Sequence, residues 1–323
     1  MRRRRLFAAL LALSSIATPY AAQAQDKFPV RPVKIIVPQP AGGGTDTLAR
    51  LVADLLSRKW SQPVVVENIS GGSGNIGAAQ AFKAAPDGYT LMITSPGAVS
   101  TNRFLFKSMP YDPSRFTSIA LLTTGPMVLS VRNGFGSTTV KDLVAYAKAN
   151  PGKITAGHPG VGTVLHLAHV QLDMLGDFTT TLVPYRGLSP ALNDLMAGHI
   201  DVMFDTPTTS LPLHRSGKIK IIATGTPERV REYPDVPTVA ETLPGFRAVT
   251  WYAMVAPPNL ASGLADRINR DVNEILARND VAERVRAIQM EPGTGLRASA
   301  GAFIADETEL WGRVIKRANI TPQ

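Results

Sequence analysis

The sequence predicts an α/β protein built from two similar halves. Short runs rich in β-branched residues alternate with amphipathic stretches of helical length, and this alternation begins at residue 33 and again after residue 125. Strands separated by helices of this length are typical of βαβ units. We therefore expect a mainly parallel sheet in each half.

The elements follow one another closely along the chain. In the first half we predict strand 33–37, helix 47–59, strand 64–67, helix 76–84 and strand 90–94. In the second half we predict strand 127–131, helix 140–150, strand 153–156, helix 164–175, strand 180–184, helix 190–197 and strands 202–204 and 220–223. A proline-rich stretch then precedes strand 249–255, and two helices with apolar stripes at 264–276 and 303–315 close the chain.

The N-terminus has the pattern of a secretory signal peptide. Four arginines at residues 2–5 precede an apolar run at 6–16, and Ala22-Gln23-Ala24 matches a cleavage site. The run is shorter than the roughly 20 residues of a membrane-spanning helix, so we expect cleavage near Ala24 and no membrane anchor. The Sec and twin-arginine export routes both remain open. We expect a periplasmic protein.

Composition excludes several classes of function. The chain has 323 residues and no cysteine, which excludes disulfides, thiolate metal sites and cysteine nucleophiles. Loss of the four signal-peptide arginines would lower the formal net charge from +9 to +5. The remaining Lys and Arg residues are scattered, so no nucleic-acid footprint is present. We expect a monomer without a cofactor or a metal.

The stretch VPQPAGGGTDTLAR, residues 37–50, places three consecutive glycines between the first strand and its helix. Thr45, Asp46 and Thr47 are good N-caps, and a helix N-terminus presents backbone N–H groups and a positive dipole end, which favour an anion. Glycines let a ligand approach the backbone closely, but they also suit a tight turn. The loop by itself leaves both interpretations open.

Neither of two nucleotide-binding motifs is complete. A P-loop needs G-x-x-x-x-G-K-[ST], but Gly217-Lys218 is followed by Ile219. Residues 72–77, GSGNIG, satisfy G-x-G-x-x-G, but the next strand ends in SPG at 95–97, without an acidic residue to hold a ribose. We interpret residues 72–77 as a turn that lets the following helix pack closely.

A third glycine-rich loop, GHPGVGT at residues 157–163, again joins a strand to a helix and has Thr163 as its N-cap. Two such helix starts, one in each half, would hold both ends of a small acid from opposite sides of a cleft.

Signals for catalysis are few. The G-x-S-x-G motif is absent. His166, His169 and Asp173 share a helix face but match no metal-binding motif. We interpret His166 either as a hydrogen-bond donor lining the cleft or as a structural histidine. Asp205 follows strand 202–204, where α/β proteins place ligands, or else it caps the next turn.

The chain resembles the Bug family of extracytoplasmic solute receptors over nearly its whole mature length. The matching segments are PAGGGTDTLAR (40–50), GGSGNIGAAQAFKAAPDGYTL (71–91), MPYDP (109–113), GVGTVLHLAH (160–169), VPYRGLSPALNDLMAGHIDVMFD (183–205), YPDVPTVAE (233–241) and GFRAVTWYAMVAP (245–257). Two positions depart from the family pattern. Gln39 stands where an aromatic residue is usual, and His158-Pro159 replaces a small pair.

The resemblance implies a type II periplasmic-binding-protein fold. After signal peptide 1–24, lobe 1 would comprise residues 25–128 and 250–323, and lobe 2 residues 129–249, with hinges near 125–131 and 249–255. The lobes would close over a tricarboxylate, a dicarboxylate, an acidic amino acid or an aromatic acid, which is delivered to membrane subunits of a tripartite tricarboxylate transporter. The residues expected to contact the ligand are Gln39, Ala41, Gly42, Gly43, Thr45, Asp46, Ser95, His158, Gly160, Gly162, Thr163, His166 and Asp205.

Such a receptor would perform no chemistry. Two other functions stay open from the sequence. One is a carboxylate sensor that acts through a membrane signalling partner. The other is a secreted NAD-binding or hydrolytic enzyme that uses residues 72–77 or His166.

Overall fold

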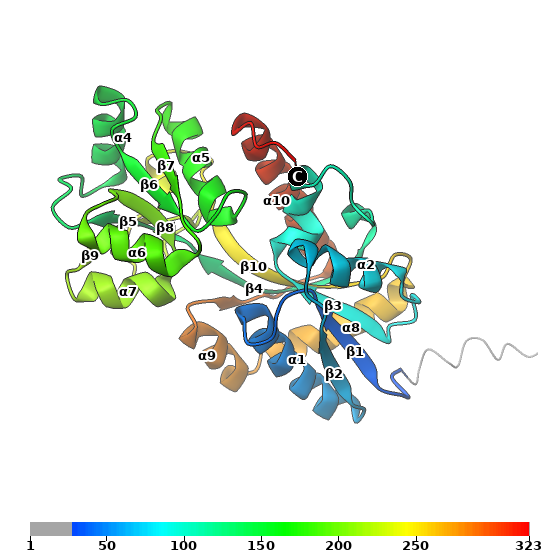
Figure 1. Ribbon diagram of the computed structural model, residues 1–323. Helices are drawn as coiled ribbons and strands as arrows, with labels where there is room; N and C mark the ends of the chain where they lie inside the picture. The colour runs from blue at the N-terminus through cyan, green and yellow to red at the C-terminus, as the bar shows by residue number, and fades with distance from the viewer. Residues whose placement is uncertain (1–27, 323) are drawn as a thin grey trace, which may run out of the picture.

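The computed structural model describes residues 28–322, which form two α/β lobes side by side (Figure 1). The predicted signal peptide lies outside this range. No helix within the described range is long and apolar enough to cross a bilayer.

Lobe 1 is built on a six-stranded sheet of order β11-β4-β10-β3-β1-β2. Its strands are β1 (Val33–Val37), β2 (Val64–Asn68), β3 (Thr90–Thr94), β4 (Thr117–Pro126), β10 (Val249–Ala256) and β11 (Glu291–Pro292). Its helices are α1 (Gly44–Trp60), α2 (Asn75–Lys83), α3 (Asn102–Leu105), α8 (Ser262–Leu276), α9 (Asn279–Ala287) and α10 (Arg297–Arg317).

Alternation along β1 explains why helices cover both faces of this sheet. Ile35 points into a core shared with α1 and α8, whereas its neighbour Ile36 points into a core that includes α2. On α1, Leu48, Val52 and Leu56 recur at helical spacing and are buried against the first of these cores.

Lobe 2 has a five-stranded sheet of order β7-β6-β8-β5-β9. Its strands are β5 (Val128–Arg132), β6 (Thr155–His158), β7 (Thr181–Pro184), β8 (Val202–Asp205) and β9 (Ile219–Thr224). Its helices are α4 (Val140–Ala149), α5 (Val164–Gly176), α6 (Leu188–Ala197) and α7 (Pro207–Arg215).

The predicted mainly parallel sheets are in fact mixed. β1, β2 and β3 pair in parallel, as do β6, β7 and β8, but β10 is antiparallel to both β3 and β4, and β5 is antiparallel to β8 and β9. The strands that carry the chain between lobes enter each sheet from the opposite direction to the βαβ strands, and this produces the antiparallel pairs.

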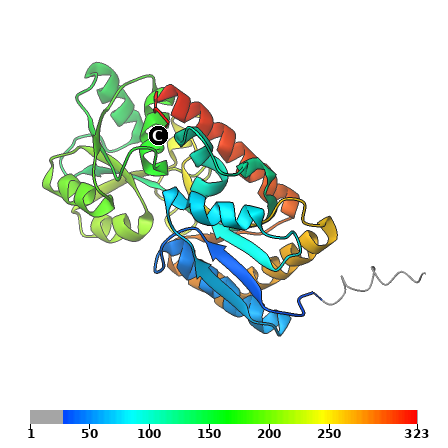
Figure 2. The same ribbon diagram turned by 45° about the vertical axis from the view of Figure 1, so that its right-hand side comes forward.

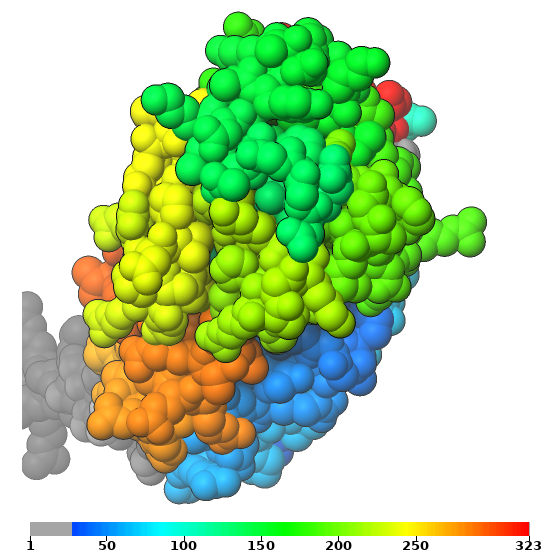
Figure 3. Space-filling view, turned by 90° about the vertical axis from the view of Figure 1, so that its left-hand side faces the viewer, coloured from blue at the N-terminus to red at the C-terminus, as the bar shows by residue number. Residues whose placement is uncertain are grey.

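Backbone hydrogen bonds mark where the chain crosses between lobes. Met127, between β4 and β5, donates to Ala248 O at 3.4 Å and accepts from Gly225 N at 2.7 Å. Ala248 N in turn donates to Gly225 O at 2.8 Å. On the face shown in Figure 3, lobe 2 (green to yellow) rests on the orange segment around α9, where Thr208 Oγ1 donates to Ile288 O at 3.4 Å.

Among the elements missed in the sequence prediction are β4, α7 and α9. β4 is a ten-residue strand, and α7 begins at Pro207, where the prediction had at most a turn, and contains Pro212. The two expected closing helices are present as α8 and α10, but an additional helix, α9, lies between them. α9 buries only a short apolar face, at Val281, Ala282 and Val285.

The last helix contacts both lobes. Figure 2 shows α10 (red) running along lobe 1 and ending beside α5 (green). Phe303 packs with the lobe 1 core, whereas Trp311 and Val314 belong to the core of lobe 2. The division of the chain into lobe 1 (residues 25–128 and 250–323) and lobe 2 (residues 129–249) remains a prediction. Helix α10 belongs to lobe 1 in this division but packs against both lobes.

Candidate functional site

The first glycine-rich loop lies at the carboxyl edge of the lobe 1 sheet, between β1 and α1. The first intrahelical bond runs from Thr47 N to Gly43 O at 2.9 Å. The N–H groups of Gly44, Thr45 and Asp46 precede it and so have no acceptor within the helix. Residues 41–44 are exposed. This helix start is therefore open to an acceptor from outside.

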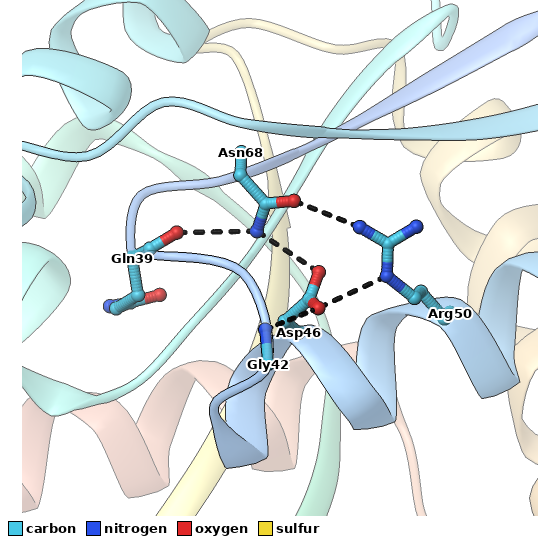
Figure 4. Close-up of polar contacts among 5 residues, drawn as sticks. All are labelled: Gln39, Gly42, Asp46, Arg50 and Asn68. Carbon is cyan, nitrogen blue, oxygen red and sulfur yellow. Dashed lines mark hydrogen bonds and ion pairs between the residues drawn. The ribbon is translucent and has the colours of Figure 1, made fainter.

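The Asp46 side chain holds this loop in place by hydrogen bonds (Figure 4). Its Oδ2 accepts from Gly42 N at 2.8 Å and from Arg50 Nε at 3.0 Å, and its Oδ1 accepts from Asn68 Nδ2 at 3.0 Å. The Asn68 amide also donates to Gln39 O at 3.2 Å. Both Asp46 oxygens and the Gly42 N–H thus have partners inside the protein.

The negative charge of Asp46 is compensated by its neighbour Arg50. Its hydrogen bond from Arg50, followed by the one from Gly42, lowers the pKa of the buried carboxyl to about 2. Arg50 Nη2 also donates to Asn68 Oδ1 at 3.0 Å. Asp46 therefore contributes little net negative charge beside the free N–H groups.

Gln39 and Ser95, two predicted site residues, meet at the ends of neighbouring strands. Gln39 Nε2 donates to Ser95 Oγ at 3.1 Å, while the buried Oε1 of Gln39 has no partner. Ser95 follows β3, and β3 pairs with β1. The pair lies next to the first loop.

Tyr252 was missed in the sequence prediction. It lies on β10, and a Cβ built on Gly44 would be 2.6 Å from its hydroxyl. Its oxygen also hydrogen-bonds with the Thr45 side chain, and burial raises its pKa. The third glycine of GGG therefore makes room for a hinge-strand hydroxyl. Tyr252 lies within GFRAVTWYAMVAP, but no sequence signal links it to residue 44.

The second loop, between β6 and α5, is held by histidines. His158 Nδ1 accepts from Gly160 N at 3.3 Å, and His166 Nδ1 accepts from Gly162 N at 3.2 Å. Thr163 caps α5 as predicted, because its Oγ1 accepts from His166 N at 3.3 Å. The His158 and His166 rings lie 4.4 Å apart.

These contacts set the charge and tautomer of both rings. Burial, and then the neighbouring His158, lowers the pKa of His166 to about 4, and burial also lowers the pKa of His158. Because each Nδ1 accepts a backbone N–H, the proton of each neutral ring is on Nε2. His158 and His166 are therefore neutral N–H donors.

The remaining polar candidates are occupied in structural roles. His169 Nε2 accepts from Phe204 N at 3.0 Å, and Thr180 N donates to Asp173 Oδ2 at 2.8 Å. Asp205 is fully buried and accepts from Thr209 Oγ1 and, at 2.8 Å, from Ser210 Oγ of α7. Within residues 28–322, no group of three His, Cys, Asp or Glu side chains could hold a metal ion.

A cavity of about 390 Å³ lies where the two lobes meet. Lobe 1 contributes Ser73, Asn102 and Leu105, and lobe 2 contributes Val161 and His166. A Cβ on Gly162 would be 3.2 Å from the Leu105 side chain, so the second loop abuts lobe 1.

The turn at residues 72–77 has two roles. The predicted close packing is present, because a Cβ on Gly77 would be 2.4 Å from Ile69 O and 3.0 Å from Pro38 Cα. Ser73, which has a positive φ of 55°, lines the interlobe cavity and was missed in the sequence prediction.

The two loops remain separate halves of a site. Within the described part of the chain, no hydrogen bond joins residues 38–46 to residues 158–166. Each loop presents one open helix start, since Val164 and Leu165 of α5, like Gly44 and Thr45 of α1, have N–H groups without an intrahelical acceptor.

A profile of TctC, the tripartite tricarboxylate transporter family receptor, matches residues 48–320. The chain is 37% identical to the UPF0065 protein in the TAR-I ttuE-ttuC' intergenic region of Agrobacterium vitis, over 95% of this chain and 90% of that protein. It is 32% identical to protein BugT of Bordetella pertussis, over 95% of this chain and 94% of BugT.

Solved structures show the same fold. R. palustris Rpa4515 with adipate has a TM-score of 0.74 at 34% identity, and covers 92% of this chain and 100% of its own. MatC from Rhodopseudomonas palustris with bound malate has a TM-score of 0.70 at 31% identity, and covers 89% and 100%. A TctC solute-binding protein from Polaromonas without ligand has a TM-score of 0.82 at 25% identity, and covers 90% and 99%.

Proposed function

Because this chain belongs to the tripartite tricarboxylate transporter receptor family, with Bug proteins among its relatives, we propose that it captures a small carboxylate between its lobes in the periplasm. It then delivers the carboxylate to the membrane subunits of a tripartite transporter and performs no chemistry itself. Adipate and malate, which are bound in two structural neighbours, support a carboxylate as the ligand.

The observation that carries this proposal is the pair of open helix starts. α1 offers the N–H groups of Gly44, Thr45 and Asp46 from lobe 1, and α5 offers those of Val164 and Leu165 from lobe 2. Backbone N–H groups at a helix N-terminus, together with the helix dipole, bind anions without a cationic side chain. A carboxylate accepts hydrogen bonds from such N–H groups, which otherwise donate to water.

The surroundings favour an anion held by neutral donors. Arg50 offsets the charge of Asp46 beside the first loop, and His158 and His166 are neutral beside the second. Of the predicted contacts, we retain Gln39, Ala41, Gly43, Thr45 and Ser95 at the first loop. At the second loop we retain His158, Gly160, Gly162, Thr163 and His166. Gly42 and Asp46 act by holding the first loop in shape, whereas Asp205 accepts hydrogen bonds from Thr209 and Ser210 of α7.

The proposal includes an open state before capture and a closed state around the ligand. Lobe closure about the crossing at Met127 and Ala248 would bring the two helix starts together around the ligand.

Calorimetric titration of the purified mature chain against di- and tricarboxylates, acidic amino acids and aromatic acids tests this function. We expect at least one carboxylate to bind, and a matching amide or alcohol of the same carbon skeleton not to bind. Solution scattering with that carboxylate should show a smaller radius of gyration. If no carboxylate in the panel binds, the proposed function is wrong.

A further inference from the structure

A short segment of lobe 1 reaches from the first loop to the second. It begins at Ser95, which hydrogen-bonds with Gln39 beside the first loop, and continues through a π-helical turn, Gly97–Thr101, into α3. α3 ends at Leu105, whose side chain lies 3.2 Å from the position of a Cβ on Gly162 in the second loop. π-helical turns are rare and are frequent at functional sites. The segment therefore lies against both loops.

This segment is fixed to lobe 1 by buried hydrogen bonds. The buried Asn102 side chain donates from Nδ2 to Ser73 O at 3.0 Å and to Asn75 Oδ1 at 2.8 Å. The hydroxyl of Tyr111, which is also buried, donates to Ala98 O at 2.8 Å. Because these bonds join the segment to the start of α2 and to the chain before β4, the end of the segment moves with lobe 1.

The residue before Leu105 meets the part of α10 that packs with lobe 2. A Cβ built on Gly312 would be 2.7 Å from Cζ of the Phe104 ring, so a glycine leaves room for the ring at this position of the helix. Gly312 lies between Trp311 and Val314, which belong to the core of lobe 2, and Phe104 packs against the same core. Glycine is a poor helix former, so room for the ring, rather than helix stability, accounts for its place in α10.

Phe104 and Gly312 lie apart from the two helix starts. The Phe104 ring lines a separate cavity of about 330 Å³ between α3, the chain before β4 and α10, and the lining of this cavity includes no residue from 38–46 or 158–166. Neither Phe104 nor Gly312 lines the cavity where the lobes meet. A change at either residue therefore acts on a bound carboxylate through the position of the lobes.

We propose that Phe104, seated at Gly312, and Leu105, seated against Gly162, form a clasp that sets the angle between the lobes in the ligand-free protein. The clasp is a third junction between the lobes, beside the two strand crossings. Because capture requires closed lobes, a shift in the balance between open and closed states changes the affinity for every carboxylate by the same factor. This effect on affinity rests on the proposed function, whereas the effect on the lobe angle does not.

Gly312→Ala tests the Phe104 side of the clasp. The added methyl group acts as a wedge between α3 and the part of α10 that packs with lobe 2, and so favours the open state. We expect the Kd for adipate, malate and citrate to rise by one common factor of at least about threefold in calorimetry, for each of the three that binds to wild type.

The lobe angle is measured separately from binding. The chain has no cysteine, so spin labels can be placed at Lys83→Cys on α2 and Lys148→Cys on α4, two exposed positions in different lobes. In Gly312→Ala without ligand, we expect the distance between the labels to shift away from its wild-type value, in the direction opposite to the shift that adipate produces in wild type.

Two further variants separate the contact from the substitution itself. Phe104→Leu, added to Gly312→Ala, removes the three ring atoms nearest the new methyl group and should return Kd to within about twofold of wild type. Gly301→Ala is the matched control on the same helix, because its added Cβ would have contacts only at 3.5 Å or more. We expect it to leave Kd and the lobe distance unchanged.

Leu105→Ala tests the other side of the clasp. The second loop then loses its support from lobe 1, so we expect faster amide hydrogen exchange at Gly160 and Gly162 in the ligand-free protein. Gly42, whose N–H donates to Asp46 in the first loop, is the control within the same protein and should exchange as in wild type.

The results distinguish the clasp from the proposed function. An unchanged lobe distance in a folded Gly312→Ala variant, a change in Kd that differs between the carboxylates, or unchanged exchange in Leu105→Ala would overturn the clasp. If circular dichroism shows that Gly312→Ala does not fold, the exchange measurement on Leu105→Ala decides. If wild type binds no carboxylate, the proposed function is wrong, and the lobe distance and the exchange rates still test the clasp.

Discussion

The indole Nε1 of Trp251, on hinge strand β10, donates to Glu307 Oε2, on α10, at 3.0 Å. Trp311 Nε1 donates to the same oxygen at 3.0 Å. Arg247 Nε lies 2.9 Å from Glu307 Oε1, close enough for an ion pair but not aligned as a hydrogen bond. Since Trp311 belongs to the core of lobe 2, one buried carboxylate ties the hinge strand to the helix that spans both lobes.

Glu307→Ala should therefore destabilise the protein strongly. The change leaves two indole N–H groups and Arg247 without their partner, and breaking a buried charged network costs about 3–5 kcal/mol. Glu307→Gln keeps an acceptor and most of the volume, so we expect a smaller loss. Urea unfolding followed by circular dichroism measures both.

Glu309→Gln is the control for this change. Glu309 lies on the same helix, but its side chain is 73% exposed and pairs with Arg313. We expect it to change the free energy of unfolding by less than about 1 kcal/mol. A Glu307→Ala variant that is as stable as this control would show that the network does not contribute to the free energy of unfolding.

The βαβ parts of the fold could be predicted from the sequence because their signals are local. Strands 33–37 and 90–94 were predicted with the bounds of β1 and β3, since a short apolar run beside a glycine or proline signal suffices. The antiparallel pairing of β10 could not be predicted, because it depends on where the chain crosses between lobes. α7 was missed because Pro212 stands inside it.

The two strand-to-helix loops were predicted from the sequence, but the contacts within them were not. Asp46 was expected at the edge of the anion grip. In the structure it braces the loop, because parallel pairing places Asn68 beside Val37 and so brings a β2 amide to the start of α1. Tyr252 reaches Gly44 across more than two hundred residues of sequence, and no local pattern records such a contact.

Gly44→Ala should weaken carboxylate binding. A Cβ at 2.6 Å from the Tyr252 hydroxyl forces either the helix start or the tyrosine to move, and the N–H groups of α1 move with the helix start. We expect about a tenfold or larger rise in Kd, which corresponds to about 1.4 kcal/mol or more. Tyr252→Phe in the same protein removes the oxygen and should restore part of the affinity, as calorimetry can show.

Gly263→Ala provides a matched control for this pair. Gly263 also lies in a first helical turn, in α8, but nothing lies within 4 Å of the position of an added Cβ. We expect unchanged affinity and a gain in stability of about 0.4–1 kcal/mol. If adding Tyr252→Phe to the Gly44→Ala variant does not improve its affinity for carboxylate, the contact between residues 44 and 252 does not set the position of the loop.

The Asp46 network should make stability depend on pH in acid. The pKa of Asp46 is about 2 in the folded protein, below its usual value of 3.8, so its stabilising contribution is complete above pH 4 and is lost as the pH falls through 4 toward 2. Because Arg50 is more than half exposed, we expect about 1–2 kcal/mol rather than the full shift.

Unfolding measured between pH 5 and pH 2.5 for wild type and Asp46→Asn tests this dependence. The difference in their unfolding free energies should shrink as the pH falls. Asp54→Asn, which removes an exposed partner of Arg58 on the same helix, should leave the pH dependence close to that of wild type. A constant difference between wild type and Asp46→Asn across this range would mean that the Asp46 charge contributes nothing.

Gly225→Ala should impair both stability and lobe closure. An added Cβ would be 2.3 Å from Ala248 O, where the chain passes between the lobes, and Gly225 N donates to Met127 O at 2.7 Å in the same crossing. Because backbone rather than a flexible side chain blocks the space, we expect a loss of about 1–3 kcal/mol. Closure requires these strands to bend, so the decrease in radius of gyration on adding carboxylate should be smaller than in wild type. Gly301→Ala is the control, because an added Cβ on this α10 residue would have only ordinary contacts at 3.5 Å or more, so this variant should close as wild type does. If the Gly225→Ala variant compacts as fully as wild type on adding carboxylate, this crossing is not part of the hinge.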